Sequence, residues 1–442
     1  MSSRGATALL LLFLAVGATA QKPAVPKASE SKFRTRFAAA LADPRGKDAK
    51  DFAADAKSLA EKHGREAVVA LLRRGPEIAS GEPKPRRFGN ETETFRRFDR
   101  TIVGFTFKSD GATYRYAVDL PKDYDPAKPA PLFVDPGHGS GAKLDDKGKA
   151  DFLPFYRRAV DQGGLADALV ARTEIIEQIG ADGLAGARPE EAILRVFDAF
   201  FHDIAGRFAI DPERIVVAGL SQTGYWAWYL GLARADRLRG IVPMSAVTWQ
   251  TNGYQPNLAH LAIYVLHGDK DTVCPVAQPR ATTKMLEGLG ARVHYEEIAG
   301  AGHDAKVWMG LAAGLEWLFE KPRPHTPRKI AKNLQTLADP WCYWARIDAL
   351  ASEGNGKAAT KPTATFEAAV DGQTITVKSE GVKRLTLALN ALVLDLTKPV
   401  RVVWNEKEVA AAAPKLDLPK TVAAVLERAD WGVIPEAFIE LK

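Results

Sequence analysis

The sequence predicts an α/β protein, in which a doubly wound, mostly parallel sheet lies between a helical N-terminal segment and a small β-rich C-terminal domain. Three patterns predict it. Apolar residues follow helical spacing in residues 31–80, strands alternate with helices over residues 101–326, and a period of two begins near residue 327. We therefore divide the chain into segments 1–20, 21–30, 31–100, 101–326 and 327–442.

Length and composition are those of a globular protein. The 442 residues suffice for a catalytic domain of about 200 to 250 residues with accessory segments. Hydrophobic residues make up 46% of the chain and charged residues 26%, which argues against a disordered chain. The 60 basic and 54 acidic residues are interspersed, without the long basic run that would indicate a nucleic-acid partner.

The N-terminus has the layout of a secretory signal peptide. Arg4 precedes an apolar run at Ala8–Val16, and Ala18-Thr19-Ala20 precedes polar residues. We expect cleavage after Ala20, a secreted or periplasmic product without a membrane span, and a flexible linker at residues 21–30. The alternative is an uncleaved N-terminal anchor.

The chain has two cysteines, Cys274 and Cys342. One bridge is feasible in an exported protein, and two free thiols agree with the sequence at least as well. No CxxC pair, Cys/His cluster or HExxH sequence marks a zinc site, so we expect no metal and no cofactor.

One apolar stripe, with steps of three and four residues, predicts helix in the N-terminal segment as far as Gly75-Pro76. We interpret the stripe as core packing. It comprises Phe52, Ala56, Leu59, His63, Ala67 and Leu71.

Residues 101–326 show the alternation expected of a parallel sheet. Pro189, followed by two glutamates, marks the start of one helix, and residues 142–190 are an insertion that either caps the site or covers the sheet. The expected strands are Tyr114–Leu120, Pro131–Val134, Leu165–Ala171, Arg214–Leu220, Gly240–Pro243, Leu261–Leu266 and Arg292–Ile298, and two further helices are expected at Ala277–Leu289 and Lys306–Phe319.

The C-terminal segment alternates apolar and polar residues and contains Asp371-Gly372, a typical hairpin turn. We expect a β-rich domain without a helix-dominated core. It could bind carbohydrate, gate the site or stabilise the core.

Ser221 is the candidate nucleophile. It lies in Gly219-Leu220-Ser221-Gln222-Thr223-Gly224, between a buried strand and a helix that begins near Tyr225, which is the setting of a nucleophile elbow. This strained turn requires glycine two residues before the serine and a small residue two after it. Gly219 meets the first condition, whereas Thr223 is larger than the usual glycine or alanine.

A serine hydroxyl needs a base, and the base needs a carboxylate that orients it. Asp271 and His303 each follow a predicted strand, and the carboxyl ends of strands are where catalytic groups gather in open α/β sheets. The chain order of serine, aspartate and histidine predicts a Ser221–Asp271–His303 triad. Asp269 is the alternative candidate for the acid. A histidine at the position of His267 more often stabilises its turn than takes part in catalysis.

With these motifs, residues 101–326 resemble the α/β-hydrolase superfamily, near its phospholipase/carboxylesterase and prolyl-oligopeptidase-like esterase branches. The stretch from His267 to Pro275 is similar to the family's HGxxDxxVP sequence. The resemblance implies that Asp271 is the acid and His303 the base. Cys274 stands where the family usually has valine, which favours an apolar wall residue over a catalytic thiol.

An oxyanion hole needs two backbone N–H groups, and the resemblance implies where they lie. Gln222, directly after the nucleophile, supplies the first. His138-Gly139-Ser140-Gly141 is similar to the family's HGxG loop, so we place the second donor at Gly139 or Ser140. Asp135-Pro136-Gly137 departs from the usual hydrophobic approach to this loop.

Together these features predict an exported serine esterase that acts through an acyl-enzyme on a small-molecule or polysaccharide-linked ester. One alternative is a serine peptidase of the prolyl-oligopeptidase type, although those enzymes usually carry a large N-terminal propeller. Another is a non-catalytic binding protein on a hydrolase scaffold. A metal site of Asp135, His138 and Asp271 is a weaker hypothesis.

Overall fold

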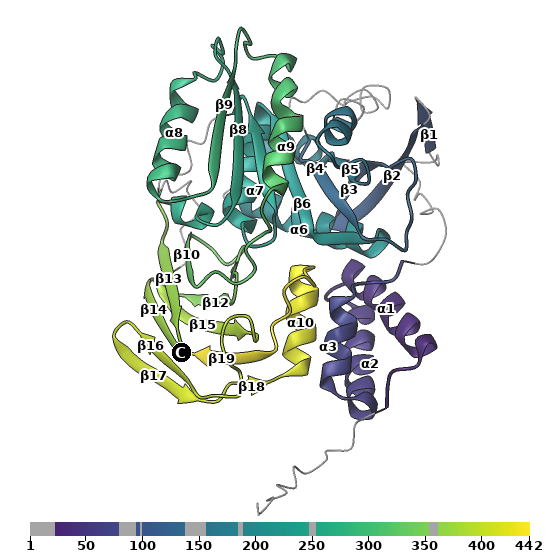
Figure 1. Ribbon diagram of the computed structural model, residues 1–442, viewed down its shortest axis with the longest axis vertical. Coiled ribbons are helices and arrows are strands. Elements are labelled where there is room, and N and C mark those ends of the chain that lie inside the picture. The colour runs from purple at the N-terminus through teal and green to yellow at the C-terminus, as the bar shows by residue number, and fades with distance from the viewer. Residues whose placement is uncertain are drawn as a thin grey trace, which may run out of the picture.

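The computed structural model describes residues 23–78, 94–97, 100–137, 156–183, 189–246, 253–352 and 361–442. The predicted signal peptide and the predicted second oxyanion donor, Gly139 or Ser140, lie outside these ranges. Figure 1 shows a mixed α/β body, a β-rich C-terminal body, and three N-terminal helices beside the latter. Within the described ranges, no helix combines the length and the apolar character needed to cross a membrane.

The α/β body is built on one sheet with the order β1-β2-β3-β5-β4-β6-β7-β8-β9 in the described residues. The strands from β5 through β4 to β9 pair in parallel, and β1, β2 and β3 extend the sheet by antiparallel pairing. The strands are β1 (Thr94–Arg97), β2 (Arg100–Ser109), β3 (Ala112–Asp119), β4 (Ala130–Asp135), β5 (Leu169–Thr173), β6 (Ile210–Leu220), β7 (Gly240–Met244), β8 (Ala262–Gly268) and β9 (Val293–Ile298).

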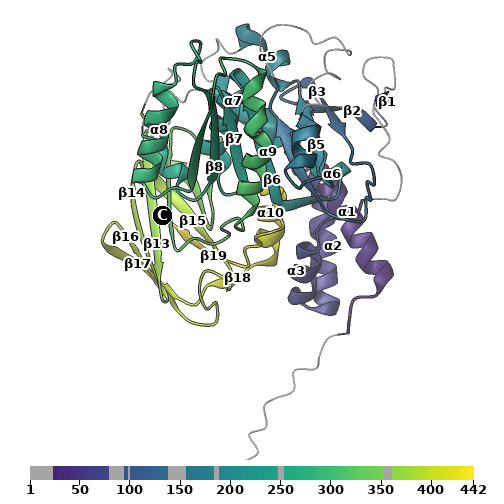
Figure 2. The same ribbon diagram turned by 45° about the horizontal axis from the view of Figure 1, so that its top comes forward.

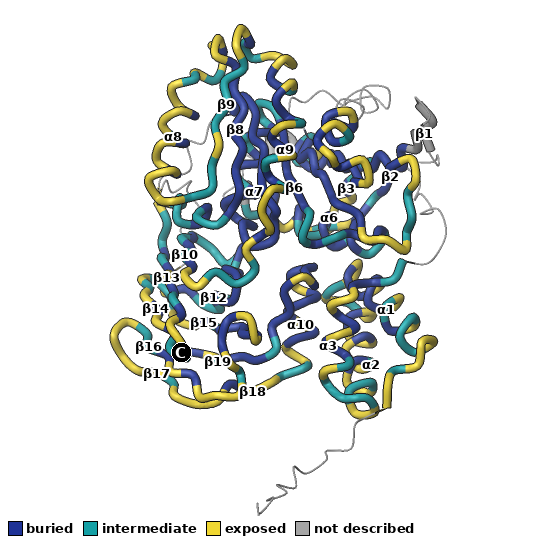
Figure 3. Tube along the Cα trace, in the orientation of Figure 1, coloured by how far each residue is buried: buried dark blue, intermediate teal, exposed yellow. Residues whose placement is uncertain are grey.

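Helices cover both faces of this sheet. One core cluster joins the sheet to α6, α7 and α8, and a second joins it to a helix at residues 156–162 and to α9. Figure 3 shows the central strands buried between these layers. The helices of this body are α5 (Ile175–Gly183), α6 (Pro189–Arg207), α7 (Gln222–Arg234), α8 (Ala277–Gly288), α9 (Leu311–Phe319) and the 3-10 helices η2 (Gln255–Leu258) and η3 (Ala305–Gly310).

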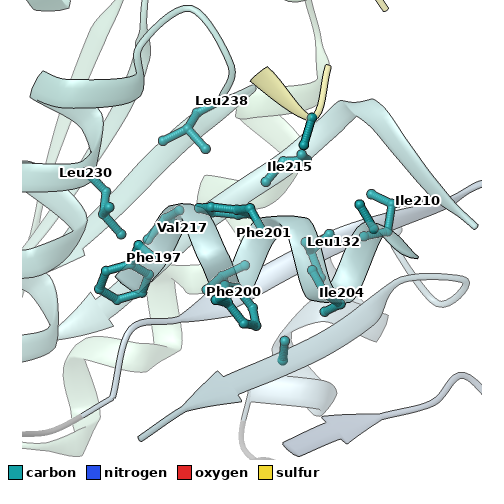
Figure 4. Close-up of a cluster of buried hydrophobic side chains, with 14 of the residues drawn as sticks. Leu132, Phe197, Phe200, Phe201, Ile204, Ile210, Ile215, Val217, Leu230 and Leu238 are labelled. Atoms are coloured by element: carbon teal, nitrogen blue, oxygen red, sulfur yellow. The ribbon is translucent and has the colours of Figure 1, made fainter. Parts of the chain in front are cut away.

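Helix α6 shows how apolar spacing fixes the layers. Its side chains Phe197, Phe200, Phe201 and Ile204 point at the sheet, where they meet strand residues such as Val217 (Figure 4). The doubly wound, mostly parallel sheet predicted from the sequence is therefore confirmed.

Two details of the α/β prediction were wrong. Residues 142–190 are not simply an insertion, because β5 lies inside them and pairs with β3 and β4; it begins at Leu169, four residues later than expected. The expected helix at Lys306–Phe319 begins as η3, since Asp304 caps a 3-10 turn by accepting the Lys306 N–H, and continues as α9.

The N-terminal helices are α1 (Lys27–Ala42), α2 (Lys47–His63) and α3 (Arg65–Arg73). The linker predicted at residues 21–30 is wrong from Lys27 onward, because Glu30 lies in the first turn of α1 and pairs with Arg74 at 2.5 Å. The predicted helical segment 31–100 also ends too late, since the sheet begins at Thr94. The predicted stripe is divided between two helices at Gly64, whose φ is 93°.

The C-terminal body is a sandwich of two five-stranded sheets in the described residues, ordered β10-β13-β14-β16-β17 and β11-β12-β15-β19-β18 around a shared core. The expected Asp371-Gly372 hairpin joins β13 and β14. The strands are β10 (Lys329–Leu334), β11 (Trp341–Cys342), β12 (Ala345–Leu350), β13 (Ala364–Asp371), β14 (Thr374–Glu380), β15 (Val382–Leu389), β16 (Val400–Trp404), β17 (Lys407–Ala412), β18 (Lys415–Leu416) and β19 (Ala437–Leu441).

The sequence prediction missed one helix here, α10 (Leu418–Arg428). Asp417 caps it by accepting the Lys420 N–H at 2.9 Å. One side of α10 packs on Trp341 and Phe438 of the sandwich.

The other side of α10 joins the core that the N-terminal helices share with the α/β body. Phe37 of α1 stacks on Phe52 of α2 with ring centroids 5.2 Å apart and meets Trp431 edge to face at 5.9 Å. Figures 1 and 2 show α10 beside these helices. Helices α1 and α10, the first and last among the described residues, are thus parts of one hydrophobic core.

Buried ion pairs connect the same bodies. Arg323, which is 1% exposed, donates to Glu213 of β6 at 2.7 Å and to Asp430 at 3.2 Å. Arg428 donates to Asp236 at 3.0 Å. Burial raises the pKa of Asp430, but Arg323 and Arg428 outweigh it and hold that pKa below its ordinary value. Removing one partner would leave the other charge buried and unpaired, so the C-terminal body cannot separate without a large cost.

We predict that Phe37→Ala lowers the free energy of unfolding by about 3–5 kcal/mol, because it opens a cavity where the N-terminal helices meet Trp431. Chemical denaturation measures the loss. Leu416→Ala, at a side chain that is 51% exposed, is the control and should change stability by less than about 0.5 kcal/mol. A loss below about 1 kcal/mol in Phe37→Ala would contradict the shared core.

Candidate active site

Ser221 lies at the strained turn between β6 and α7. Its φ of 59° and ψ of −120° are unusual for any residue with a side chain, and its N–H donates to the Met244 carbonyl at 2.8 Å. The turn requires glycine at position 219, because a Cβ there would lie 2.3 Å from Thr223 Oγ1. This is the strand, turn and helix expected for an exposed nucleophile, with the helix beginning at Gln222 rather than near Tyr225.

Thr223, the departure from the usual small residue, fits the turn. It is buried, and its Oγ1 donates to the Leu220 carbonyl at 2.9 Å. The position at which a side chain would collide with its neighbours is the next one, Gly224. A Cβ there would lie 2.7 Å from Ala246 Cβ.

Asp271 follows β8 and has three hydrogen-bond donors. Its Oδ1 accepts the N–H groups of Val273 at 3.0 Å and Cys274 at 2.8 Å, and its Oδ2 lies 2.8 Å from His303 Nδ1. Burial raises the pKa of Asp271, but the hydrogen bonds from the Cys274 N–H and from His303 outweigh it and lower that pKa. The carboxylate is therefore ionised and fixed in direction.

His303 lies in the turn after β9 and connects the other two residues. Its Nε2 is 2.8 Å from Ser221 Oγ. When the ring proton is on Nδ1, His303 donates a hydrogen bond to Asp271. Its Nε2 is then free to accept the proton of the Ser221 hydroxyl during catalysis. The His303 side chain is 18% exposed, so a substrate can reach His303 and Ser221. The structure thus brings together the three residues of the predicted triad.

The rival acid has a different role. Asp269 is exposed, and its carboxylate accepts the Gly300 N–H at 2.7 Å, which ties the β8 turn to the β9 turn. His267 is completely buried, and its Nε2 lies 2.8 Å from the Cys274 carbonyl, to which it can donate. Both residues shape the loop that presents Asp271.

Sequence reasoning missed Ser245. It follows β7 with a φ of 43°, is completely buried, and donates its N–H to the Leu266 carbonyl at 2.9 Å. Its hydroxyl is one contributor to the lowered pKa of Asp271. Its position directly after a predicted strand was the one signal that the sequence offered.

Of the predicted oxyanion donors, Gln222 is the first residue of α7, while Gly139 and Ser140 lie outside the described residues. Asp135, which also belonged to the weaker metal hypothesis, pairs with Arg172. Within the described ranges, no three His, Cys, Asp or Glu side chains gather as metal ligands would.

The two cysteines are free thiols. Burial, and then the nearby Asp271 carboxylate, raise the pKa of Cys274. Its thiol is therefore a poor nucleophile, in agreement with a wall residue.

The chain was compared with known proteins. Residues 191–309, which include Ser221, Asp271 and His303, match the family model described as phospholipase/carboxylesterase. This part of the chain is similar to that family, and the α/β body has the α/β-hydrolase fold.

Two curated proteins to which this chain is similar are named acyl-protein thioesterase 1. That of Gibberella zeae is 28% identical over 140 residues, which cover 29% of this chain and 60% of the relative. That of Neurospora crassa is 29% identical over 136 residues, which cover 28% of this chain and 56% of the relative. The match therefore spans somewhat more than half the length of each relative.

Among solved structures, the chain is similar to a thermostable esterase with 20% identity and a TM-score of 0.40, covering 50% of this chain and 63% of that chain. It is also similar to a ferulic acid esterase from Anaeromyces mucronatus with 14% identity and a TM-score of 0.40, covering 56% of this chain and 96% of that chain.

The lowered pKa of Asp271 predicts how its stability contribution depends on pH. A carboxyl whose folded-state pKa lies below its unfolded value, here 3.8, stabilises the protein above that value and loses this contribution as the pH falls through the folded pKa. We therefore expect the stability difference between the wild type and Asp271→Asn to shrink between about pH 5 and about pH 2. Denaturation across this range measures it, Asp269→Asn is the control, and a constant difference would contradict the prediction.

Proposed function

We propose that this α/β-hydrolase is a serine hydrolase that cleaves carboxylic esters through an acyl-enzyme. The observation that carries the proposal is the chain of two 2.8 Å hydrogen bonds from Ser221 through His303 to Asp271. A serine at a strained strand-to-helix turn, a partly exposed base and a buried acid are the groups that acyl transfer requires.

In the first half of the reaction, His303 Nε2 takes the Ser221 proton as Oγ attacks the ester carbonyl carbon. The positive charge that develops on the imidazole is stabilised by Asp271, which stays ionised. The Ser221 ester forms as the bond to the leaving alcohol breaks, and His303 returns the proton to that alcohol.

In the second half, water attacks the acyl-enzyme. His303 accepts a proton from the water, and the carboxylic acid leaves as the proton returns to Ser221 Oγ. In both halves the tetrahedral oxyanion needs two N–H donors, for which we propose the backbone of Gln222 and of Gly139 or Ser140.

A thioester is the second candidate substrate class, since the two curated relatives are named acyl-protein thioesterases. Both substrate classes give the same acyl-enzyme, and they differ only in whether an alcohol or a thiol leaves. The triad geometry therefore supports acyl transfer in general, and the preference between leaving groups is a separate question.

We predict that Ser221→Ala abolishes labelling by a fluorophosphonate and lowers ester turnover by about 10⁴-fold or more. Asp271→Asn should lower kcat on the order of 10⁴-fold, because the imidazole loses the partner that fixes its tautomer. Asp269→Asn is the matched control and should lower kcat less than about threefold, since that carboxylate contacts only a turn.

Steady-state kinetics with p-nitrophenyl butyrate measure these effects. Equal losses in the two aspartate variants would contradict the assignment of Asp271. A folded wild-type protein that neither hydrolyses esters nor reacts with the probe would favour the binding-protein alternative.

A further prediction concerns the leaving group. A butyryl oxygen ester and a butyryl thioester should reach the same kcat within about twofold when deacylation limits turnover, because both pass through one acyl-enzyme. A prolyl p-nitroanilide should be slower than both, since its amide is harder to acylate. Faster anilide cleavage would support a peptidase, and a kcat/KM more than about tenfold higher for the thioester would move the substrate class to thioesters.

A further inference from the structure

His267 is the last residue but one of β8, and its side chain is completely buried. Its Nε2 lies 2.8 Å from the Cys274 carbonyl oxygen. Because a carbonyl oxygen can only accept a hydrogen bond, the ring proton of His267 is on Nε2. Within the described residues, its Nδ1 has no hydrogen-bond partner. The ring therefore directs a single N–H group toward the loop that follows β8.

The same N–H group lies beside the acid of the triad. Asp271 Oδ2 is 3.5 Å from His267 Nε2 and 2.8 Å from His303 Nδ1. Since the ring proton of His303 is on Nδ1 when its Nε2 accepts from the serine, two imidazole N–H groups flank one carboxylate oxygen. The side chains of His267 and Asp271 are both fully buried, so water does not weaken the attraction between them.

His267 also acts on the other carboxylate oxygen. Cys274, whose carbonyl accepts from His267, donates its own N–H to Asp271 Oδ1 at 2.8 Å. Because one residue forms both bonds, the position of the His267 ring helps to set the position of this N–H group. Loss of the ring nitrogen therefore affects both oxygens of Asp271, and the carboxylate can turn away from His303.

The backbone of this loop is held against the turn that carries the base by other contacts. A Cβ at Gly268 would lie 2.4 Å from the Ala301 carbonyl oxygen, and the Lys270 N–H donates to the same carbonyl at 2.9 Å. These contacts fix the two backbones relative to each other without the His267 side chain. The rotation of the Asp271 side chain is fixed separately, and the contacts of His267 limit it.

We propose that His267 is a positioning residue that directs Oδ2 of Asp271 at His303 during acyl transfer. It is completely buried, so it contacts no substrate and acts through the carboxylate alone. When His303 takes the Ser221 proton, the charge that forms on its ring needs a carboxylate in line with Nδ1. His267 transfers no proton in this step. The inference rests on the proposed ester hydrolysis.

The test compares His267→Asn with His267→Gln in the full chain. Both replacements are neutral amides, but only the glutamine nitrogen reaches the position of His267 Nε2, whereas the asparagine nitrogen lies near the position of Nδ1. His267→Asn should lower kcat for p-nitrophenyl butyrate by about 10- to 100-fold, less than the loss of about 10⁴-fold expected for Asp271→Asn, because the carboxylate remains but is misdirected. KM should stay within about threefold, and His267→Gln should keep kcat within about threefold.

A double variant shows whether His267 acts through Asp271. His267→Asn combined with Asp271→Asn should have the kcat of Asp271→Asn alone within about threefold, because the group through which His267 acts is already lost. His260→Asn is the matched control. His260 Nε2 also contacts a backbone carbonyl, that of Lys329 at 2.6 Å, but it lies before the amino end of β8, so this change should leave kcat unchanged.

Nuclear magnetic resonance supplies readouts that do not need activity. In the wild type, nitrogen-15 spectra of the histidine rings should show that His267 is protonated on Nε2 and not on Nδ1. The Nδ1–H proton of His303 should give a downfield signal, because it is hydrogen-bonded to a carboxylate. His267→Gln should retain this signal, and folded His267→Asn should lose it or shift it upfield.

The outcomes separate the two proposals. An inactive wild type that no fluorophosphonate labels would overturn the proposed function, and the resonance readouts would still test the position of Asp271. The inference is overturned if the His267 proton is on Nδ1, if folded His267→Asn retains kcat, if the losses multiply in the double variant, or if His267→Gln loses as much as His267→Asn. If His267→Asn does not fold, the tautomer of His267 and the kcat of His267→Gln decide.

Discussion

Three backbone hydrogen bonds run in one direction across the carboxyl edge of the sheet, and the candidate site depends on them. Ser221 donates to Met244 at 2.8 Å, Ser245 to Leu266 at 2.9 Å, and Asp269 to Ile298 at 3.4 Å. Each turn is tied to a carbonyl at or near the carboxyl end of the neighbouring parallel strand. These bonds hold the turns that carry the nucleophile, the acid and the base in fixed positions relative to one another, although the turns are separate along the chain.

Two of the buried ion-pair clusters in the described residues have different consequences. At the junction of the bodies, Arg323 and Arg428 are matched by carboxylates from both sides, so the sandwich is fixed to the α/β body. In the sheet, where β5 pairs with β4, Arg172 lies between Asp135 and Glu177. In both places the guanidinium hydrogen bonds are directional, so they fix the positions of the chain segments that carry their partners. Apolar contacts are not directional and would fix these positions less strictly.

The sequence was sufficient for the parts that follow from local rules. Strand and helix periodicity predicted the central sheet, and the positions of Ser221, Asp271 and His303 after their strands predicted which side chains would meet. Ser245 could not be assigned in the same way, because its role depends on which strand lies between those of the nucleophile and the acid. Such adjacency is a property of the sheet order.

The errors have physical causes of the same kind. Residues 27–30 have linker composition, and their helix is stabilised by the distant Arg74. Helix α10 carried a readable cap at Asp417, but the surrounding period of two obscured it. The pairing of Asp135 with Arg172 required knowing that β5 lies beside β4, an adjacency that the predicted strand at Leu165–Ala171 did not give.

The contact between α1–α3 and α10 has a consequence for the order of folding. Arg65 and its partner Glu436 are 371 positions apart, and Phe37 meets Trp431 over a similar separation. Contacts this distant in sequence carry a large loop-closure entropy and form late. During synthesis, the apolar faces of the N-terminal helices remain partly uncovered until residues 418–436 have emerged. The nascent chain therefore exposes these apolar faces while the residues between α3 and α10 are synthesised, and α10 then covers them.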